Sequence, residues 1–157
     1  MKKRNYIILP GLVWLFSGFM LLYKGLHFIA DAILQTHSLC FRMQHLFGTA
    51  QQAATVFIGL GLLVGYVKGR FVLVKSVRRI VKRIDLLPYP IRFSQAYHPS
   101  YWLLIASMIA LGVSLRFLPI ALDIRGFIDV AIGSALINGS MLFFRAARSF
   151  NVAKTYL

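Results

Sequence analysis

Apolar residues are concentrated in four stretches of the chain, and each stretch is long enough to cross a lipid bilayer as a helix. A crossing takes about 20 apolar residues, because a helix advances about 1.5 Å per residue across a hydrocarbon core of about 30 Å. The pattern predicts spans at about 6–29, 53–74, 101–122 and 127–144. We therefore expect an all-α integral membrane protein with four transmembrane helices.

Small residues recur every four positions in the second predicted span, at Gly61, Gly65 and Gly69. Because four residues make about one helical turn, these glycines share one face, on which another backbone can approach closely. Seventy positions later, small residues recur with the same spacing, at Ala131, Ala135 and Gly139. We predict that the two faces pack against each other within the chain. The alternative is that they join copies in a homo-oligomer or bind another membrane protein.

The 70-residue offset continues beyond the small residues and indicates an internal repeat. Arg145, for example, takes the place of Lys75. We expect a single membrane domain over 1–157, made of repeat 1 at about 6–85, a connecting loop at 86–99 and repeat 2 at about 100–157. Two spans per repeat make the repeats parallel, related by an axis along the membrane normal. The second and fourth spans then run in the same direction.

The second span continues into an amphipathic segment, KSVRRIVKRI. Its cations recur at helical spacing, at Lys75, Arg78, Arg79, Lys82 and Arg83. Apolar residues occupy the other face, at Val77, Ile80, Val81 and Ile84. This pattern predicts an interfacial helix that lies along the membrane surface, attracts anionic lipid headgroups and inserts its apolar face.

The composition agrees with a membrane protein and excludes a soluble fold. The chain has a mean hydropathy of +0.72, with 18 Lys and Arg against four Asp and Glu, for a net charge of +14. The cations flank the apolar stretches, so anionic headgroups are the expected partner and nucleic acid is not. Fourteen of them lie in the N-terminus, 68–92 and the C-terminus, against four on the other side. The positive-inside rule predicts cytoplasmic termini in a multi-pass protein of the bacterial inner membrane.

The residue types that support catalysis are poorly placed for it. The four carboxylates fall at span ends or in loops, at Asp31, Asp85, Asp123 and Asp129, and no histidine lies in the middle of a span. An active site needs titratable groups that converge in a pocket, so we expect no enzymatic activity and no cofactor. The lack of a mid-membrane carboxylate also argues against proton- or sodium-coupled transport.

The segments expected on the outer side contain weak functional signals. A loop at 31–53 carries His37, Cys40, Met43 and His45. These groups would suit Cu(I), but neither a CxxC pair nor a zinc-type spacing is present, so we expect a polar loop with a short interfacial helix and no metal. A short turn is expected at 123–127, with Asp129 in the first turn of the fourth span, where the helix dipole favours an anion. Lys24 is expected to snorkel to the outer headgroups.

Four polar residues inside the second and fourth predicted spans are candidates for a functional site: Lys68, Arg70, Asn138 and Ser140. A cation beside an amide or a hydroxyl between two helices would bind an anion or a lipid phosphate. The alternative is that Lys68 and Arg70 only snorkel to the cytoplasmic headgroups.

Together these features predict a small non-enzymatic membrane protein that acts as a membrane assembly or lipid-interacting component. The alternative is a small transporter or channel for an anionic solute. A pathway needs polar side chains through the whole bilayer. The outer halves of the second and fourth spans are apolar apart from Ser134 and the end residues Thr55 and Asp129, which favours the first interpretation.

Overall fold

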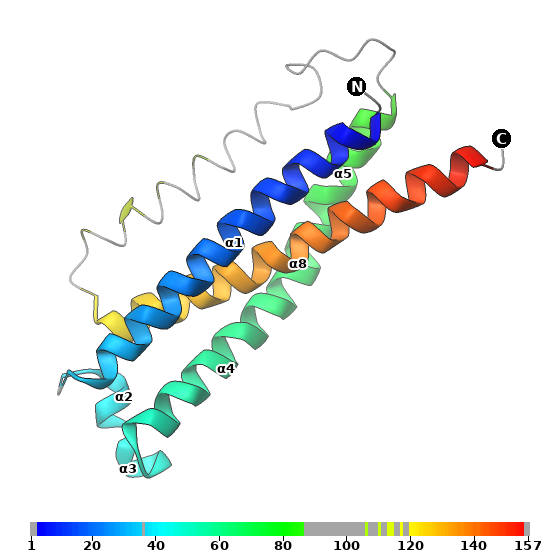
Figure 1. Ribbon diagram of the computed structural model, residues 1–157. Helices are drawn as coiled ribbons and strands as arrows, with labels where there is room; N and C mark the ends of the chain where they lie inside the picture. The colour runs from blue at the N-terminus through cyan, green and yellow to red at the C-terminus, as the bar shows by residue number, and fades with distance from the viewer. Residues whose placement is uncertain are drawn as a thin grey trace.

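The computed structural model of the chain describes residues 3–35, 37–86, 106, 110, 113, 114, 117 and 120–155. All secondary-structure elements among these residues are helices, joined by short turns (Figure 1). The long stretches are α1, Lys3–Ile33; α4, Ala50–Lys68, which continues through the π-helical η1, Gly69–Leu73, into α5, Val74–Leu86; and α8, Leu122–Thr155. Two single-turn helices, α2 (Leu39–Arg42) and α3 (Gln44–Phe47), connect α1 to α4.

Three of these stretches are long and apolar enough to cross a membrane: Arg4–Ile33, Ala50–Ile84 and Leu122–Ser149. They correspond to the first, second and fourth predicted spans. The expectation of an all-helical chain with helices long and apolar enough to cross a membrane is therefore confirmed for the described residues. The third predicted span, at 101–122, and the predicted loop at 86–99 lie almost entirely outside them.

α1 and α8 form the most extensive helix pair among the described elements, and they run antiparallel. A Cβ atom added to Gly18 would lie 2.9 Å from the carbonyl oxygen of Gly133, and one added to Gly25 would lie 2.8 Å from that of Gly126. The two backbones therefore touch, as small residues permit in membrane helices. These contacts repeat every seven residues, a spacing that the sequence interpretation missed because it followed only the four-residue spacing.

α4 packs on α8 as well, and these two helices run parallel. A Cβ atom added to Gly65 would overlap the carbonyl oxygen of Ala131, and one added to Gly69 would lie 2.9 Å from the Cα atom of Ala135. A hydrogen bond crosses the pair, because the Ser134 hydroxyl donates to the carbonyl oxygen of Leu62 at 3.0 Å. A Cβ atom added to Gly61, one turn earlier, would lie 3.1 Å from the Val130 side chain of α8.

The register of this pair differs from that of an exact repeat. Gly65 and Gly69 lie against Ala131 and Ala135, which follow them by 66 positions rather than 70. A rotation axis along the membrane normal would bring equivalent residues to the same level, so the observed pair is displaced by four residues, or about 6 Å. Gly139, which we expected on the same face, lies instead against the Trp14 ring of α1 and Leu73 of η1.

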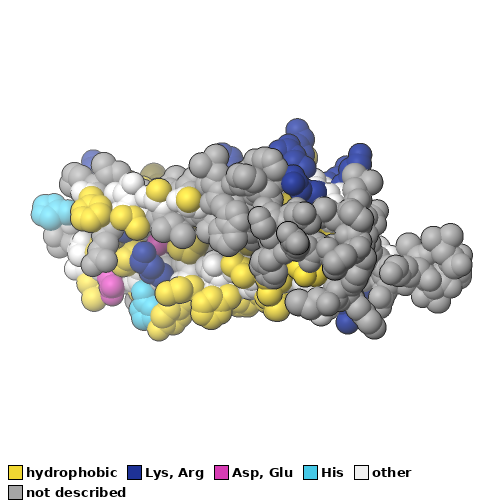
Figure 2. All heavy atoms as spheres, turned by 90° about the horizontal axis from the view of Figure 1, so that it is seen from above, with side chains coloured by type: hydrophobic (Ala, Val, Ile, Leu, Met, Phe, Trp, Pro, Cys, Tyr) yellow, Lys and Arg dark blue, Asp and Glu magenta, His cyan; other side chains and the backbone are white. Residues whose placement is uncertain are grey.

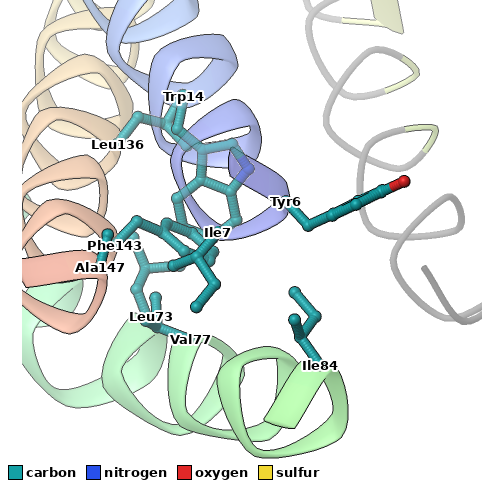
Figure 3. Packing of buried hydrophobic residues seen from close by; sticks show 9 residues of the cluster. All are labelled: Tyr6, Ile7, Trp14, Leu73, Val77, Ile84, Leu136, Phe143 and Ala147. Carbon is teal, nitrogen blue, oxygen red and sulfur yellow. The ribbon is translucent and has the colours of Figure 1, made fainter. Parts of the chain in front are cut away.

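A hydrophobic core at the N-terminal end of α1 joins all three long stretches (Figure 3). Its buried residues are Tyr6, Ile7, Trp14, Leu73, Val77, Ile84, Leu136, Phe143 and Ala147. The rings of Trp14 and Phe143 meet edge to face, with their centroids 5.3 Å apart. Val77 and Ile84 belong to α5, so part of the apolar face that we expected to insert into lipid packs against α1 and α8. Both helices reach the level of α5, because α1 begins at Lys3 and α8 continues to Thr155.

α8 is longer at both ends than the sequence pattern predicted. It begins at Leu122, so the expected turn at 123–127 is helical, and Asp123 rather than Asp129 lies in the first turn. Asp123 Oδ1 accepts a hydrogen bond from the Ile124 amide at 2.9 Å, which satisfies one of the free N–H groups of a helix start. At the other end, the expected basic tail continues the helix to Thr155.

Candidate functional site

A groove lies between the α4–η1–α5 stretch and α8. Figure 1 shows that α5 lies at the end of the molecule that holds the N-terminus. Its volume is about 920 Å³, within the range of sites for small ligands. We call it the basic groove and define it by its described lining residues: Tyr66, Arg70, Phe71, Val74, Val77, Arg78, Val81, Lys82, Asn138, Met141, Leu142, Arg145 and Ala146. These residues combine four cations with an apolar floor.

Two of the four cations, Arg78 and Arg145, lie at about the same level along the helices. Leu73 lies against Gly139, and Arg78 and Arg145 follow these two residues by five and six positions on parallel helices. Lys82 lies one turn beyond Arg78 on the same face of α5. No carboxylate occurs among the described residues that line the groove. Its described walls therefore carry a concentrated positive charge.

The apolar part of the basic groove is open to the surroundings. Phe71 on η1 is 72% exposed and Met141 on α8 is 52% exposed, and both line the groove. Val74 and Leu142 also line the groove and are partly buried. A hydrocarbon chain in the groove would thus meet apolar side chains from both helices, while a charged group would meet the cations above them.

The basic groove brings together only two of the four residues proposed as an anion site. Arg70 and Asn138 line it, from η1 and α8. The Arg70 guanidinium donates to the Tyr66 hydroxyl at 3.1 Å, and the Asn138 amide donates to the carbonyl oxygen of Ser134 at 3.2 Å. Lys68 lies outside the groove, because two residues along a helix correspond to a rotation of about 200°.

Ser140, the fourth member of the proposed site, is fully buried. Its hydroxyl donates to the carbonyl oxygen of Ile137 at 2.7 Å, within its own helix. Ser140 follows Gly126 and Gly133 at the same seven-residue spacing, which places it on the face of α8 that meets α1. This position separates it from the groove.

The five cations predicted to bind interfacial lipid are all exposed: Lys75, Arg78, Arg79, Lys82 and Arg83. Figure 2 shows the largest group of Lys and Arg side chains towards the α5 end of the molecule. Arg78 and Lys82 line the basic groove, whereas Lys75, Arg79 and Arg83 do not. The groove therefore combines part of this predicted set with part of the predicted anion site, and the sequence interpretation missed Arg145 as a member.

A second, smaller cationic pocket lies at the same end of the molecule. It has a volume of about 310 Å³ between the first turns of α1 and the last turns of α8, and Arg4 and Arg148 line it with Ile8, Phe144 and Ala147. One cationic cavity thus lies between α8 and α5, and the other lies between α8 and α1. Both are suited to anionic groups at one membrane surface.

The opposite end of the molecule holds an ion pair that the sequence interpretation did not anticipate. Lys24 Nζ lies 3.6 Å from Asp129 Oδ2. The same Lys24 Nζ lies 5.2 Å from the centre of the Phe28 ring, and the Arg125 guanidinium lies 5.7 Å from that centre. Lys24 therefore pairs with a carboxylate inside the protein rather than only with headgroups. A signal was present in the sequence, since Lys24 directly precedes Gly25 and Asp129 follows Gly126 by three positions, close to one helical turn.

Asp123 joins the segment between α1 and α4 to the start of α8. Its carboxylate is fully buried, and Oδ2 accepts a hydrogen bond from the Cys40 amide of α2 at 3.1 Å. Burial, and then the Asp123 charge, raise the pKa of the Cys40 thiol above its ordinary value. His37 and His45 are exposed while Cys40 is buried, so the structure does not gather the predicted soft-metal ligands. Among the described residues, no three His, Cys, Asp or Glu side chains converge on one point.

The basic groove has the chemistry of a site for an anionic amphiphile. Guanidinium and ammonium groups bind phosphate and carboxylate oxygens through charge-assisted hydrogen bonds. The apolar floor offers a surface for hydrocarbon. No protein-family model matches the chain, and no curated protein and no solved structure matches it either.

Proposed function

We propose that this chain is a small non-enzymatic protein of the bacterial inner membrane that binds anionic lipid in the basic groove and acts as a lipid-interacting or assembly component of the membrane. One observation carries the proposal: four cations from two helices surround an apolar floor, and no carboxylate is among the described lining residues. Each cation near an anionic surface contributes about 1 kcal/mol of attraction, so a groove that gathers four of them concentrates this effect at one place.

The proposal includes a fourth span at 101–122 and a parallel arrangement of two two-helix repeats. Support comes from the direction of the described helices. α4 and α8 run parallel, so the end of α5 at Leu86 and the start of α8 at Leu122 lie at opposite ends of the molecule (Figure 1). A chain that connects these ends has to return across the bilayer. The apolar stretch at 101–122 has the length that such a return requires.

The proposed orientation places the basic groove at the cytoplasmic surface. The N-terminus, α5 and the C-terminal part of α8 lie at one end of the molecule (Figure 1). This end contains the cations of both cavities, including Arg4 and Arg148. Because cytoplasmic segments carry the excess of Lys and Arg, both termini are proposed to be cytoplasmic. The groove then faces the leaflet surface with the higher density of anionic headgroups.

Transport of an anionic solute is the weaker alternative. It requires a polar path between the cations at the two ends of the molecule. Between α4 and α8, the contact of Gly65 with Ala131 brings the two backbones together and leaves no space for a solute. Flux of an anion through proteoliposomes that is lost in Lys68→Gln or Arg70→Gln would favour this alternative over lipid binding.

Thermal unfolding of the purified protein in neutral detergent tests the proposal. A ligand that binds only the folded state raises the melting temperature, so phosphatidylglycerol should stabilise the protein more than phosphatidylcholine does. Arg145→Gln should reduce this difference, because it removes a cation from the groove. Arg79→Gln is the matched control, since Arg79 is exposed on α5 outside the groove. Equal effects of the two substitutions would show attraction to the whole surface and would overturn the groove as the site.

A further inference from the structure

The charge of the basic groove bears on which anionic lipid it fits. Arg78 and Arg145 lie at about the same level and Lys82 lies one turn beyond them, whereas Arg70 lies eight residues, or about 12 Å, deeper than Arg78. Arg70 already donates to the Tyr66 hydroxyl. The outer part of the groove is therefore a cluster of three cations from two helices.

A single negative charge matches this cluster poorly. The phosphodiester of phosphatidylglycerol carries one charge, so two of three neighbouring cations would remain uncompensated beside an apolar floor, where repulsion is less screened than in water. A terminal phosphate carries about −1.5 to −2 charges at pH 7 and three acceptor oxygens. Guanidinium groups bind such oxygens in pairs, so Arg78 and Arg145 are suited to hold a terminal phosphate from opposite sides.

The apolar floor indicates that this phosphate belongs to a lipid. Phe71 and Met141 are both largely exposed, at 72% and 52%, below the cation cluster. Exposed apolar side chains on both walls give a hydrocarbon chain a surface that free phosphate or pyrophosphate does not use. The charge and the floor thus select the same type of ligand.

We infer that the basic groove is a binding site for a lipid whose headgroup ends in a phosphate monoester or a diphosphate, in preference to phosphodiester lipids. The inference rests on the proposed lipid-binding function and narrows its ligand class. Arg78, Lys82 and Arg145 bind the terminal phosphate, and Phe71, Val74 and Met141 contact the hydrocarbon chain.

Lipid binding by the full-length protein in nanodiscs of phosphatidylcholine tests the inference. Phosphatidic acid and phosphatidylglycerol with identical acyl chains are titrated, and inorganic pyrophosphate is titrated separately. Phosphatidic acid should bind about fivefold to tenfold more tightly than phosphatidylglycerol at neutral pH, because it carries additional charge against the same cations. The preference should shrink at about pH 5, where the terminal phosphate loses its second charge.

Two matched double variants locate the preference. Arg78→Gln with Lys82→Gln removes two cations from the groove, and Lys75→Gln with Arg79→Gln removes two exposed cations from α5 outside it. The first variant should bring the two lipids to nearly equal affinity, and the second should leave the preference in place. Equal loss of preference in both variants would overturn the groove as its origin.

The remaining outcomes separate the inference from the proposed function. Equal binding of the two lipids by the unmodified protein, with both weakened by Arg145→Gln, would overturn the terminal-phosphate inference and leave lipid binding in the groove standing. Binding of neither lipid above phosphatidylcholine would overturn both. Saturation by pyrophosphate at concentrations comparable to phosphatidic acid would show a site for soluble anions and would overturn the assignment to a lipid.

Discussion

Lys24 of α1 and Asp129 of α8 form an ion pair of 3.6 Å between two helices that both have the length of a membrane span. The two side chains differ in exposure, since Lys24 is 49% exposed and Asp129 only 4%. The Asp129 charge also lies within range of Arg125. A carboxylate buried in an apolar helix is costly without a cation beside it. The pair therefore adds an electrostatic contact between α1 and α8 beside the close approach of Gly25 and Gly126.

Replacing Lys24 and replacing Asp129 should lower the stability by different amounts. Lys24→Met leaves the buried Asp129 carboxylate without its nearest cation, and we expect a loss of about 2 kcal/mol, less than for a fully buried pair because Lys24 is half exposed. Asp129→Asn leaves a lysine that can reach the headgroups, and we expect a loss of about 1 kcal/mol or less. Unfolding in detergent measures both values.

The double variant Lys24→Met with Asp129→Asn provides the control for this ion pair. If the residues act as a pair, the double variant should be more stable than the sum of the two single losses predicts. Strictly additive losses would show that the side chains act independently, and the ion pair would then contribute nothing to stability.

Substitutions of two glycines in α4 test whether the glycine face of this helix packs against α8. Gly65→Ala places a methyl group where the carbonyl oxygen of Ala131 lies, so the helices have to separate, and we expect a loss of about 2 kcal/mol or more. Gly59→Ala adds the same methyl group where nothing lies within 4 Å, and stability should be unchanged or slightly higher. Melting temperatures of the two variants that agree within error would contradict a role of the glycine face in packing.

The proposed four-span topology predicts the side of the membrane on which each loop lies. A reporter that is active only in the cytoplasm should be active when fused after Leu157 or inserted at 86–97, and silent near Gln44. The reason is the concentration of cations at the end of the molecule that holds both termini. Activity near Gln44 would be incompatible with this topology.

The glycine spacing of the second span located the face of α4 that meets α8, but it did not give the register of that contact. The spacing of Gly61, Gly65 and Gly69 is a local pattern, and the structure places all three against α8. The level at which the helices meet depends on side chains from both, such as the Ser134 hydroxyl that bonds to Leu62. The internal repeat makes Gly65 equivalent to Ala135 and therefore predicted that these two residues lie at the same level. The structure instead places Gly65 against Ala131, one turn earlier on α8.

The candidate site shows the same limitation. Arg78 and Lys82 were recognised because they recur at helical spacing on one segment. Arg145 faces them only because η1 and α8 meet at Leu73 and Gly139, a contact between residues far apart in the chain. Lys24 and Asp129 are separated by 105 positions, and only the seven-residue glycine spacing of α1 and α8 relates them. The register between helices that are distant in the sequence therefore determines which of these residues meet, and the local sequence patterns do not contain this information.

The hydrogen bond between the Cys40 amide and the Asp123 carboxylate connects α2 to the start of α8. Cys40 is the only cysteine of the chain, so its reaction with a maleimide reports on the exposure of this one position. The thiol is fully buried, and its pKa is raised, mainly by burial and then by Asp123. Because the folded state binds the thiol proton more tightly than the unfolded chain does, this contribution to stability is complete below the ordinary thiol pKa. It is lost as the pH rises through the raised value.

Asp123→Ala should expose Cys40 and accelerate its labelling by about tenfold, because a buried amide loses a hydrogen bond to a charged acceptor. In the unmodified protein, labelling of Cys40 should be slow. Because the pKa of its thiol is raised, the labelling rate should still increase at a pH at which a free thiol is already fully ionised. Thr55→Ala is a suitable control, since the Thr55 hydroxyl donates only to Gln51 of its own helix among the bonds that the structure describes. Complete labelling in denaturing detergent provides the reference for all three proteins. Equal labelling rates for Asp123→Ala and the unmodified protein would mean that α2 is held on α8 by its apolar contacts and that the Asp123 bond is dispensable.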